Sequence, residues 1–76
     1  MEPLDEALRM IKRQAELESA MRRHGGIRIT EERELFELRS ALTQFPAAVT
    51  AIMETAFRMR RPVDTISAED VDHLSH

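Results

Sequence analysis

The sequence predicts an all-α protein, and three observations support this fold class. Apolar residues recur at spacings of three and four along most of the chain, which is the period of an α-helix. Two glycines and two of the three prolines, Pro3 and Pro62, stand where helices would begin or end. The one alternating run, 27–30, is too short to form a strand alone. With 76 residues, we expect a single helical domain over 1–76.

The first helix is predicted from Pro3 to His24. Proline suits the first helical position, and Asp5 and Glu6 follow in the first turn, where acidic side chains complement the helix dipole. Gly25 then supplies a left-handed stop. The apolar residues form two displaced stripes, one of Leu4, Leu8, Ile11 and Ala15 and one of Met10, Leu17 and Met21. A helix that is apolar on two sides contacts two neighbours, or one neighbour and a partner chain.

A tight loop follows, and it contains the alternating run 27–30, IRIT. In an extended run the two isoleucines point to one side and Arg28 points to the other. Thr30 is a favoured residue type for a helix N-cap, and the acids Glu31 and Glu32 behind it suit a first turn. We therefore expect a strand-like segment that ends at Thr30 and a second helix that starts directly after it.

The second helix carries the most regular pattern in the chain. Nine apolar residues follow one another at heptad spacing, three and four residues apart in turn: Leu35, Leu38, Leu42, Phe45, Val49, Ile52, Ala56, Met59 and Val63. We call this set the seam. It keeps its phase through Pro46, although proline inside a helix costs on the order of 3 kcal/mol. Because the phase is unbroken, we favour one long helix, kinked at Pro46, over about Glu31–Arg61; the alternative is a break and a restart.

Pro62 ends this helix, and 63–66 is expected to be a short extended link. Ser67 and Asp70 have the spacing of a capping box, in which each side chain bonds to the backbone N–H of the other residue. A short helix from Ala68 to Leu74 therefore closes the chain. The predicted order is helix, tight loop, long helix, short link and short helix, which can pack as a helical hairpin.

Composition argues against several classes of function. There is no cysteine, tyrosine, tryptophan, glycine-rich phosphate loop or recognisable nucleophile motif, so we expect no enzyme, no cofactor and no small-molecule substrate. Glu69, His73 and His76 share a helix face, but they lie on the last residues, and no metal site is predicted. No run has transmembrane length or the layout of a signal peptide, which indicates a cytoplasmic protein without membrane contact.

The class that remains is a non-enzymatic protein-interaction or regulatory module. A core built from so few residues is marginal, no disulfide can reinforce it, and association with another chain is a common remedy. We expect a homodimer or a complex with a protein partner, with the seam as the interface: Leu35, Leu38, Leu42, Phe45, Val49, Ile52, Ala56 and Met59. Phe36 falls beside the seam, where it either packs on the first helix or contacts a partner.

A DNA-binding regulator is the alternative. The candidate contacts to phosphates lie at the end of the first helix and in the loop: Arg22, Arg23, Arg28 and Thr30. The competing interpretation of Arg28 is a salt bridge to Glu31 or Glu32. A net charge of −3 argues against an unspecific nucleic-acid binder, so nucleic acid is a possible partner and not the first expectation.

Two motifs resemble those of the histone fold. Residues 21–30, MRRHGGIRIT, are similar to the histone first-loop pattern of basic residues, glycine, then arginine, a hydrophobic residue and Ser or Thr. Residues 65–71, TISAEDV, are similar to the Thr-hydrophobic-x-x-x-Asp-hydrophobic signature of the second loop and last helix. The resemblance covers roughly residues 20–74 and implies a histone-fold-like handshake dimer with Arg28 and Thr30 facing DNA. Pro46 in the central helix, the longer first helix and the acidic charge depart from that pattern.

The order of a strand-like run and then two helices is also similar to ribbon-helix-helix repressors, in which paired strands of a dimer enter the major groove. That resemblance implies base contacts by Arg28 and Thr30. A plain antiparallel helical hairpin, acting as an adaptor, chaperone or anti-activator, is the third architecture that the sequence allows.

Overall fold

The first helix has the bounds that the sequence predicts. In the computed structural model, which describes residues 3–26 and 28–75, α1 spans Pro3–His24. Gly25 follows with a φ of 71°, a left-handed conformation that glycine adopts without a steric penalty. α1 contacts each of the other elements, so its two apolar stripes serve more than one neighbour.

The prediction of one long second helix over Glu31–Arg61 is wrong. The segment forms two helices, α2 (Ile29–Leu42) and α3 (Pro46–Met59). The three residues between them donate their backbone N–H groups to carbonyls three residues back, at 3.0–3.3 Å, which closes the end of α2 in a tight turn. Pro46 is the first residue of α3, where a missing N–H is not needed, and Phe45 before it has φ −124° and ψ 50°, outside the helical region. The chain therefore breaks at this proline instead of bending.

The start of α2 also differs from the prediction. Ile29 and Thr30 lie in the first turn of the helix. The prediction of a strand-like segment is therefore wrong for these residues, and so is the prediction of an N-cap at Thr30. Ile27 lies outside the described residues. Arg28 is the N-cap, and its backbone N–H donates to Oε1 of Glu31 at 3.3 Å. A carboxylate three residues into the helix thus satisfies one N–H that lies ahead of the first helical turn.

The C-terminal part confirms one prediction and corrects another. Val63–Thr65 forms a 3-10 turn, η1, in place of the predicted extended link, and the N–H of Thr65 donates to the carbonyl of Pro62 at 3.0 Å. The last helix, α4, spans Ala68–Ser75. Its capping box is confirmed: the N–H and the hydroxyl of Ser67 both donate to Oδ2 of Asp70 at 3.0 Å, and the Asp70 N–H donates to Ser67 Oγ at 3.3 Å.

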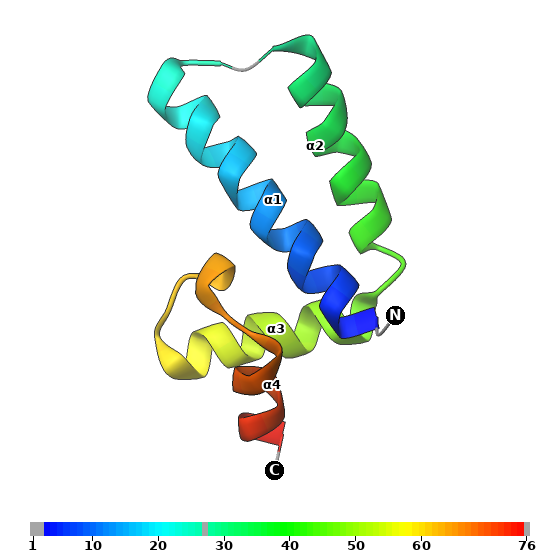
Figure 1. Cartoon of the computed structure of the whole chain (residues 1–76), viewed down its shortest axis with the longest axis vertical. Helices are drawn as coiled ribbons and strands as arrows, with labels where there is room; N and C mark the ends of the chain where they lie inside the picture. The colour runs from blue at the N-terminus through cyan, green and yellow to red at the C-terminus, as the bar shows by residue number, and fades with distance from the viewer. Residues whose placement is uncertain (1–2, 27, 76) are drawn as a thin grey trace.

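The predicted all-α class is confirmed, because the described residues form four α-helices and one 3-10 turn with no strand. α1 and α2 lie side by side and run in opposite directions, with α3 crossing the end of the pair that lies away from the loop (Figure 1). α4 packs against α3 and α1. The chain measures 41 × 25 × 15 Å along its principal axes, and the longest axis runs from the α1–α2 loop at one end to α4 at the other (Figure 1).

The main core joins one half of α1 to α3, η1 and α4. Its buried side chains come from four parts of the chain: Ala7, Leu8, Ile11, Ile52, Ala56, Ile66 and Val71. Leu17 of α1 and Leu35 of α2 are buried farther along the helix pair. Two ion pairs on the surface of the α1/α2 pair link the two helices. Arg13 Nε lies 2.6 Å from Glu34 Oε2, and Arg39 Nη2 lies 3.1 Å from Glu18 Oε1. Exposed pairs of this kind contribute little stability.

The end of α3 provides a direct test of local strain. Arg60 has a φ of 55° and is the only non-glycine residue with positive φ in the described part of the chain. An L side chain in this conformation costs roughly 1 kcal/mol, which glycine avoids. We expect Arg60→Gly to raise the free energy of unfolding by about 0.5–1 kcal/mol in urea titrations. Arg58→Gly, inside the same helix, should lower it by about 1 kcal/mol. An unchanged Arg60→Gly protein would show that this position is not strained.

The α4 capping box predicts a pH dependence. The backbone N–H of Ser67, together with its hydroxyl, lowers the pKa of Asp70 from its ordinary value. Because the folded-state pKa is lowered, the ionised carboxylate stabilises the fold above the ordinary carboxyl pKa of about 4, and this contribution disappears as the pH falls further.

We expect the difference in unfolding free energy between wild type and Asp70→Asn to be constant near neutral pH and to shrink below about pH 4. Urea titrations at a series of pH values measure it. Asp72→Asn removes the same charge from an exposed side chain of α4 and separates the effect of the cap from that of net charge. A difference that persists unchanged in acid would contradict the role of the ionised cap.

Candidate functional site

The seam residues lie largely within the chain's own packing. Of the eight predicted interface residues, Leu35, Ile52 and Ala56 are buried. The other five are partly buried, and most of these pack against the main core: Leu38, Leu42, Phe45, Val49 and Met59. The heptad spacing thus corresponds to the sides of α2 and α3 that face the rest of the molecule. Side chains outside the seam are therefore better candidates for a contact surface than the seam residues are.

Two large apolar side chains stand exposed on the opposite side of α3. Met53 is 57 % exposed and Phe57 is 86 % exposed, and residues four apart lie on the same face of a helix. α3 contains only two charged residues, Glu54 and Arg58, and both lie beside Met53 and Phe57 on the side away from the core. We call the exposed residues Thr50, Met53, Glu54, Phe57 and Arg58 the outer face of α3. Ile29 and Phe36 are also exposed, but they lie two turns apart on α2.

Besides a hollow of about 320 Å³ that Glu54 and Arg58 line together with Leu74 of α4, the outer face of α3 borders two hollows beside Met53. One is an apolar groove of about 480 Å³ between α1, α2 and α3, lined by Ile11, Gln14, Ala15, Glu18, Arg39, Leu42, Val49, Met53 and Val63. The other has a volume of about 620 Å³ and surrounds Phe57, lined by Met53, Ala56, Phe57, Arg58, Arg60, Arg61 and Val63. Because Met53 and Val63 line both, the two hollows form one continuous surface beside α3.

The charged groups around these hollows differ in the hydrogen bonds and ion pairs that they make. At the groove, Gln14 and Arg39 donate to Oε1 of Glu18 at 3.2 and 3.1 Å, and these bonds, that of Gln14 foremost, lower the pKa of Glu18. Arg61 is held by Asp70 at 3.4 Å and by the carbonyl of Thr65 at 2.6 Å. Glu54 and Arg58 are in none of the five ion pairs found among the described residues. They lie one turn apart on the same side of α3, an order of acid before base that is favourable within a helix.

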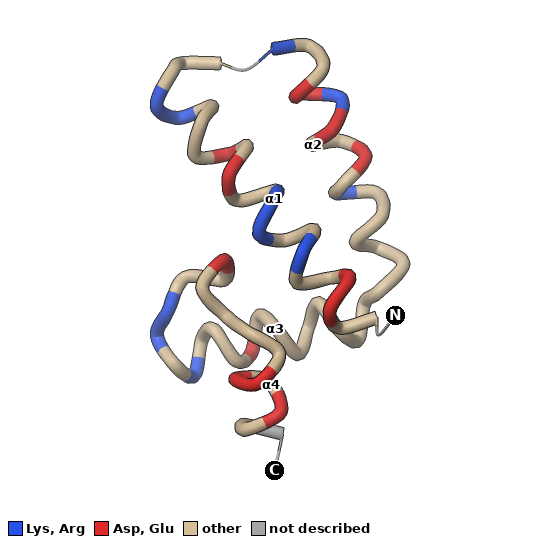
Figure 2. Tube along the Cα trace, viewed as in Figure 1, with Lys and Arg blue, Asp and Glu red and all other residues tan. Residues whose placement is uncertain are grey.

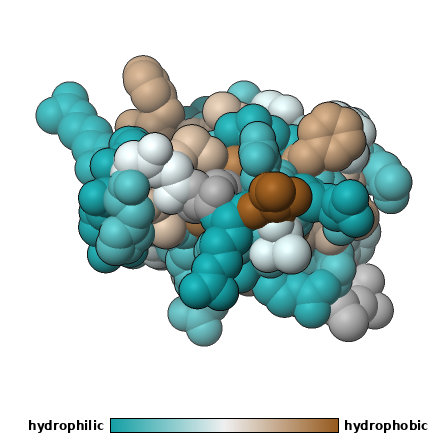
Figure 3. All heavy atoms as spheres, turned by 90° about the horizontal axis from the view of Figure 1, so that it is seen from above, coloured by the Kyte–Doolittle hydropathy of each residue, from teal (hydrophilic) through white to brown (hydrophobic). Residues whose placement is uncertain are grey.

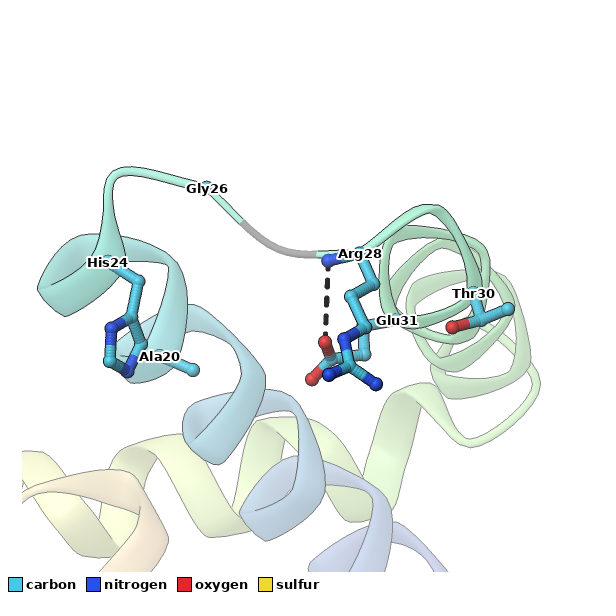
Figure 4. A pocket seen from close by; sticks show the side chains of 6 residues that line it. All are labelled: Ala20, His24, Gly26, Arg28, Thr30 and Glu31. Atoms are coloured by element: carbon cyan, nitrogen blue, oxygen red, sulfur yellow. Dashed lines mark hydrogen bonds between the residues drawn. The ribbon is translucent and has the colours of Figure 1, made fainter.

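The second candidate region is the end of the molecule that holds the α1–α2 loop. Arg22, Arg23, Arg28 and Thr30 are all exposed there, and basic residues lie on both sides of the loop in Figure 2. An open hollow of about 700 Å³ separates the two helix ends, lined by Ala20, His24, Gly26, Arg28, Thr30 and Glu31. In Figure 4, the side chains of Arg28 and Glu31 lie together on one side of this hollow, across from His24, while Thr30 points away. The loop thus presents a mixed charge and not a purely basic cradle.

Seen from this end, the surface is mainly hydrophilic, with a few hydrophobic side chains standing apart from one another (Figure 3). Scattered apolar side chains are ordinary on a protein surface and do not mark a docking site. The outer face of α3, where two such side chains sit one turn apart beside a groove, is the more distinctive feature.

Neither a metal centre nor a membrane span is found in the described residues. No group of three or more His, Asp or Glu side chains lies close enough to hold a metal ion over 3–26 and 28–75, and His76 lies outside the described residues. No helix of this part combines the length and hydropathy that crossing a bilayer requires.

Sequence reasoning did not identify Met53 and Phe57 as candidates, because both fall outside the seam. The available signal was the low charge of 46–59, which has more large apolar residues than one buried side of a helix accommodates. No protein-family model, curated protein or solved structure matches this chain.

Proposed function

We propose that the chain is a non-enzymatic protein-interaction module that binds its partner through the outer face of α3. The observation that carries this proposal is the pair Met53 and Phe57, exposed one turn apart on a helix whose other side is already in the core. Burying a phenylalanine side chain contributes about 1.5–3 kcal/mol, so a single residue of this kind can anchor an interface.

The groove beside Met53 supports the same proposal. Apolar residues of three helices line it, and the polar groups at its edge are bonded to one another. A partner that covers Met53 and Phe57 can therefore place an apolar side chain in the groove without leaving a buried polar group unpaired. An apolar anchor with a satisfied polar rim is the usual anatomy of a protein interface.

Site-specific photo-crosslinking in living cells tests this function. A benzoylphenylalanine side chain is placed at position 57, and for comparison at position 36, where Phe36 is similarly exposed on α2. We expect discrete protein adducts from position 57 that disappear when Met53→Asp is added, and only background from position 36. Equal background from both positions would contradict the proposal.

DNA binding is the second candidate function, and one observation favours it. Arg22, Arg23 and Arg28 are exposed at one end of the molecule, and the ion pairs found in 3–26 and 28–75 involve none of them. A fluorescence-anisotropy titration of random duplex DNA at two salt concentrations tests it. Binding that weakens steeply with salt and is lost in Arg28→Ala would establish DNA binding, because phosphate contacts release counterions. No binding at low salt would leave protein interaction alone.

A further inference from the structure

We propose that the partner of the outer face of α3 is an acidic amphipathic helix, whose apolar side chains cover Met53 and Phe57 and whose carboxylates pair with arginines at the end of α3. This inference rests on the proposed function, because it names the chemistry of the partner for the same surface. The observation that carries it is the set of residues that line the hollow around Phe57.

This hollow is lined by apolar and basic side chains. Arg58, Arg60 and Arg61 line it together with four apolar residues, and no acid is among the described residues at its wall. All three arginines are exposed. An exposed aromatic ring surrounded by cations offers an apolar contact and a positive potential at the same place, and a partner with apolar and acidic side chains complements both.

The acids nearby leave part of this positive charge available. Arg61 is already held by Asp70 at 3.4 Å. Arg60 is in none of the ion pairs found over 3–26 and 28–75. Glu54 lies one turn before Arg58, but it lines the hollow beside α4 and not the one around Phe57. Carboxylates of a partner can therefore reach Arg58 and Arg60 from the side of Phe57.

The shape of the surface favours a helical partner. The groove and the hollow together follow α3 from Val49 to Arg60, a stretch of about 16 Å, which a helix of three turns covers. The described residues contain no strand whose edge an extended peptide could join. A groove between helices takes the apolar side of an amphipathic helix. Because the arginines lie at one end of this surface, we expect the acids of the partner to be grouped toward one of its ends.

A membrane surface of anionic lipid matches these observations less well. Apolar side chains beside arginines also suit lipid headgroups, but a flat bilayer surface leaves the hollow around Phe57 unfilled. η1 and α4 pack on α3 and carry the exposed acids Asp64, Glu69 and Asp72. These acids repel an anionic surface, whereas a narrow helix can bind beside them.

Peptide selection on the full chain tests the proposal. Random peptides of roughly 12–16 residues, enough for three to four helical turns, are selected from a display library, and those that also bind Phe57→Asp are removed. We expect the enriched peptides to carry apolar residues at helical spacing and Asp or Glu toward one end.

Fluorescence anisotropy with an enriched peptide then measures the contribution of the arginines. Arg58→Gln/Arg60→Gly removes two cations, and glycine suits the left-handed φ of 55° at position 60. We expect this variant to raise the dissociation constant roughly tenfold or more at low salt, with a smaller effect at high salt, because salt screens exposed charges.

Lys12→Gln/Arg33→Gln is the matched control, because it removes the same charge from exposed residues of α1 and α2 that line neither hollow beside Met53. It should leave the dissociation constant unchanged. Enriched peptides without acids, or an affinity that ignores the loss of both arginines, would overturn the acidic partner. A selection without enriched peptides would overturn it too, and sedimentation of the chain with vesicles of equal parts phosphatidylcholine and phosphatidylserine would then assign the surface to a membrane. The photo-crosslinks at position 57 decide separately whether any protein binds there.

Discussion

Ile52→Ala is expected to lower the free energy of unfolding by about 2–5 kcal/mol, a large part of the total for a chain of this size. Ile52 has no exposed surface and lies in the main core, where α1, α3, η1 and α4 meet. Its removal would leave a cavity at the point that joins the α1/α2 pair to the rest of the molecule. Urea denaturation followed by circular dichroism measures the loss.

Phe36→Ala is the matched control, because it deletes a larger side chain from a position that is 70 % exposed. We expect it to change the free energy of unfolding by no more than about 0.5 kcal/mol. If Ile52→Ala were as mild as this control, Ile52 would not be a core residue. The seam would then be free to serve as an interface between chains.

Phe57→Asp is expected to abolish partner binding at the outer face of α3 with little effect on the fold. Phe57 is 86 % exposed, so the isolated chain loses almost no buried area, whereas a complex at this face would have to bury a carboxylate beside Met53. We expect the dissociation constant to rise at least roughly a hundredfold, as for the loss of an interface anchor. A titration with the partner captured by photo-crosslinking at position 57 measures the dissociation constant, and circular dichroism checks the helix content.

Phe36→Asp makes the identical substitution at the other exposed phenylalanine and should leave the association unchanged. Phe57→Gln adds a variant without a negative charge near the end of α3, where the helix dipole disfavours one. If Phe57→Asp and Phe57→Gln both associate as wild type does, the outer face of α3 is not the contact surface.

The parts of the fold that could be predicted from sequence are those with local signals. α1 begins at Pro3 and ends before Gly25, and α4 begins at the Ser67–Asp70 capping box. Each signal acts within one helical turn through a backbone hydrogen bond or a fixed φ, so it does not depend on the rest of the molecule. The all-α class follows from the same local periodicity.

The break between α2 and α3 was hidden by the seam. Apolar spacing reports which side of each helix is buried, and two helices that both pack on α1 can keep a common phase without being continuous. The local signals were Pro46, which suits a first helical position, and Phe45, which proline keeps out of the helical region. Arg28 was missed as an N-cap because the cap bond comes from Glu31, three residues later, and not from its own side chain.

The candidate site could be predicted only in part. The place of Arg22, Arg23 and Arg28 between two helices predicts that they lie exposed near one loop, and the structure has them exposed. That Met53 and Phe57 lie outside the core depends on how α3 crosses α1 and α4, which is a matter of tertiary packing. A prediction based on one continuous helix with the spacing of the seam therefore does not identify Met53 and Phe57 as contact residues.

The central claim is that the seam is the chain's own core and that the outer face of α3 is the surface for association. The methionines test it most directly, because Met53 lies on the outer face and Met59 lies in the seam. With ¹³C-methyl-labelled methionine, we expect only the methyl resonance of Met53 to shift when the partner captured at position 57 is added, while those of Met10, Met21 and Met59 stay in place. A shift of Met59 with Met53 unmoved would contradict the account and return the seam to the role of interface.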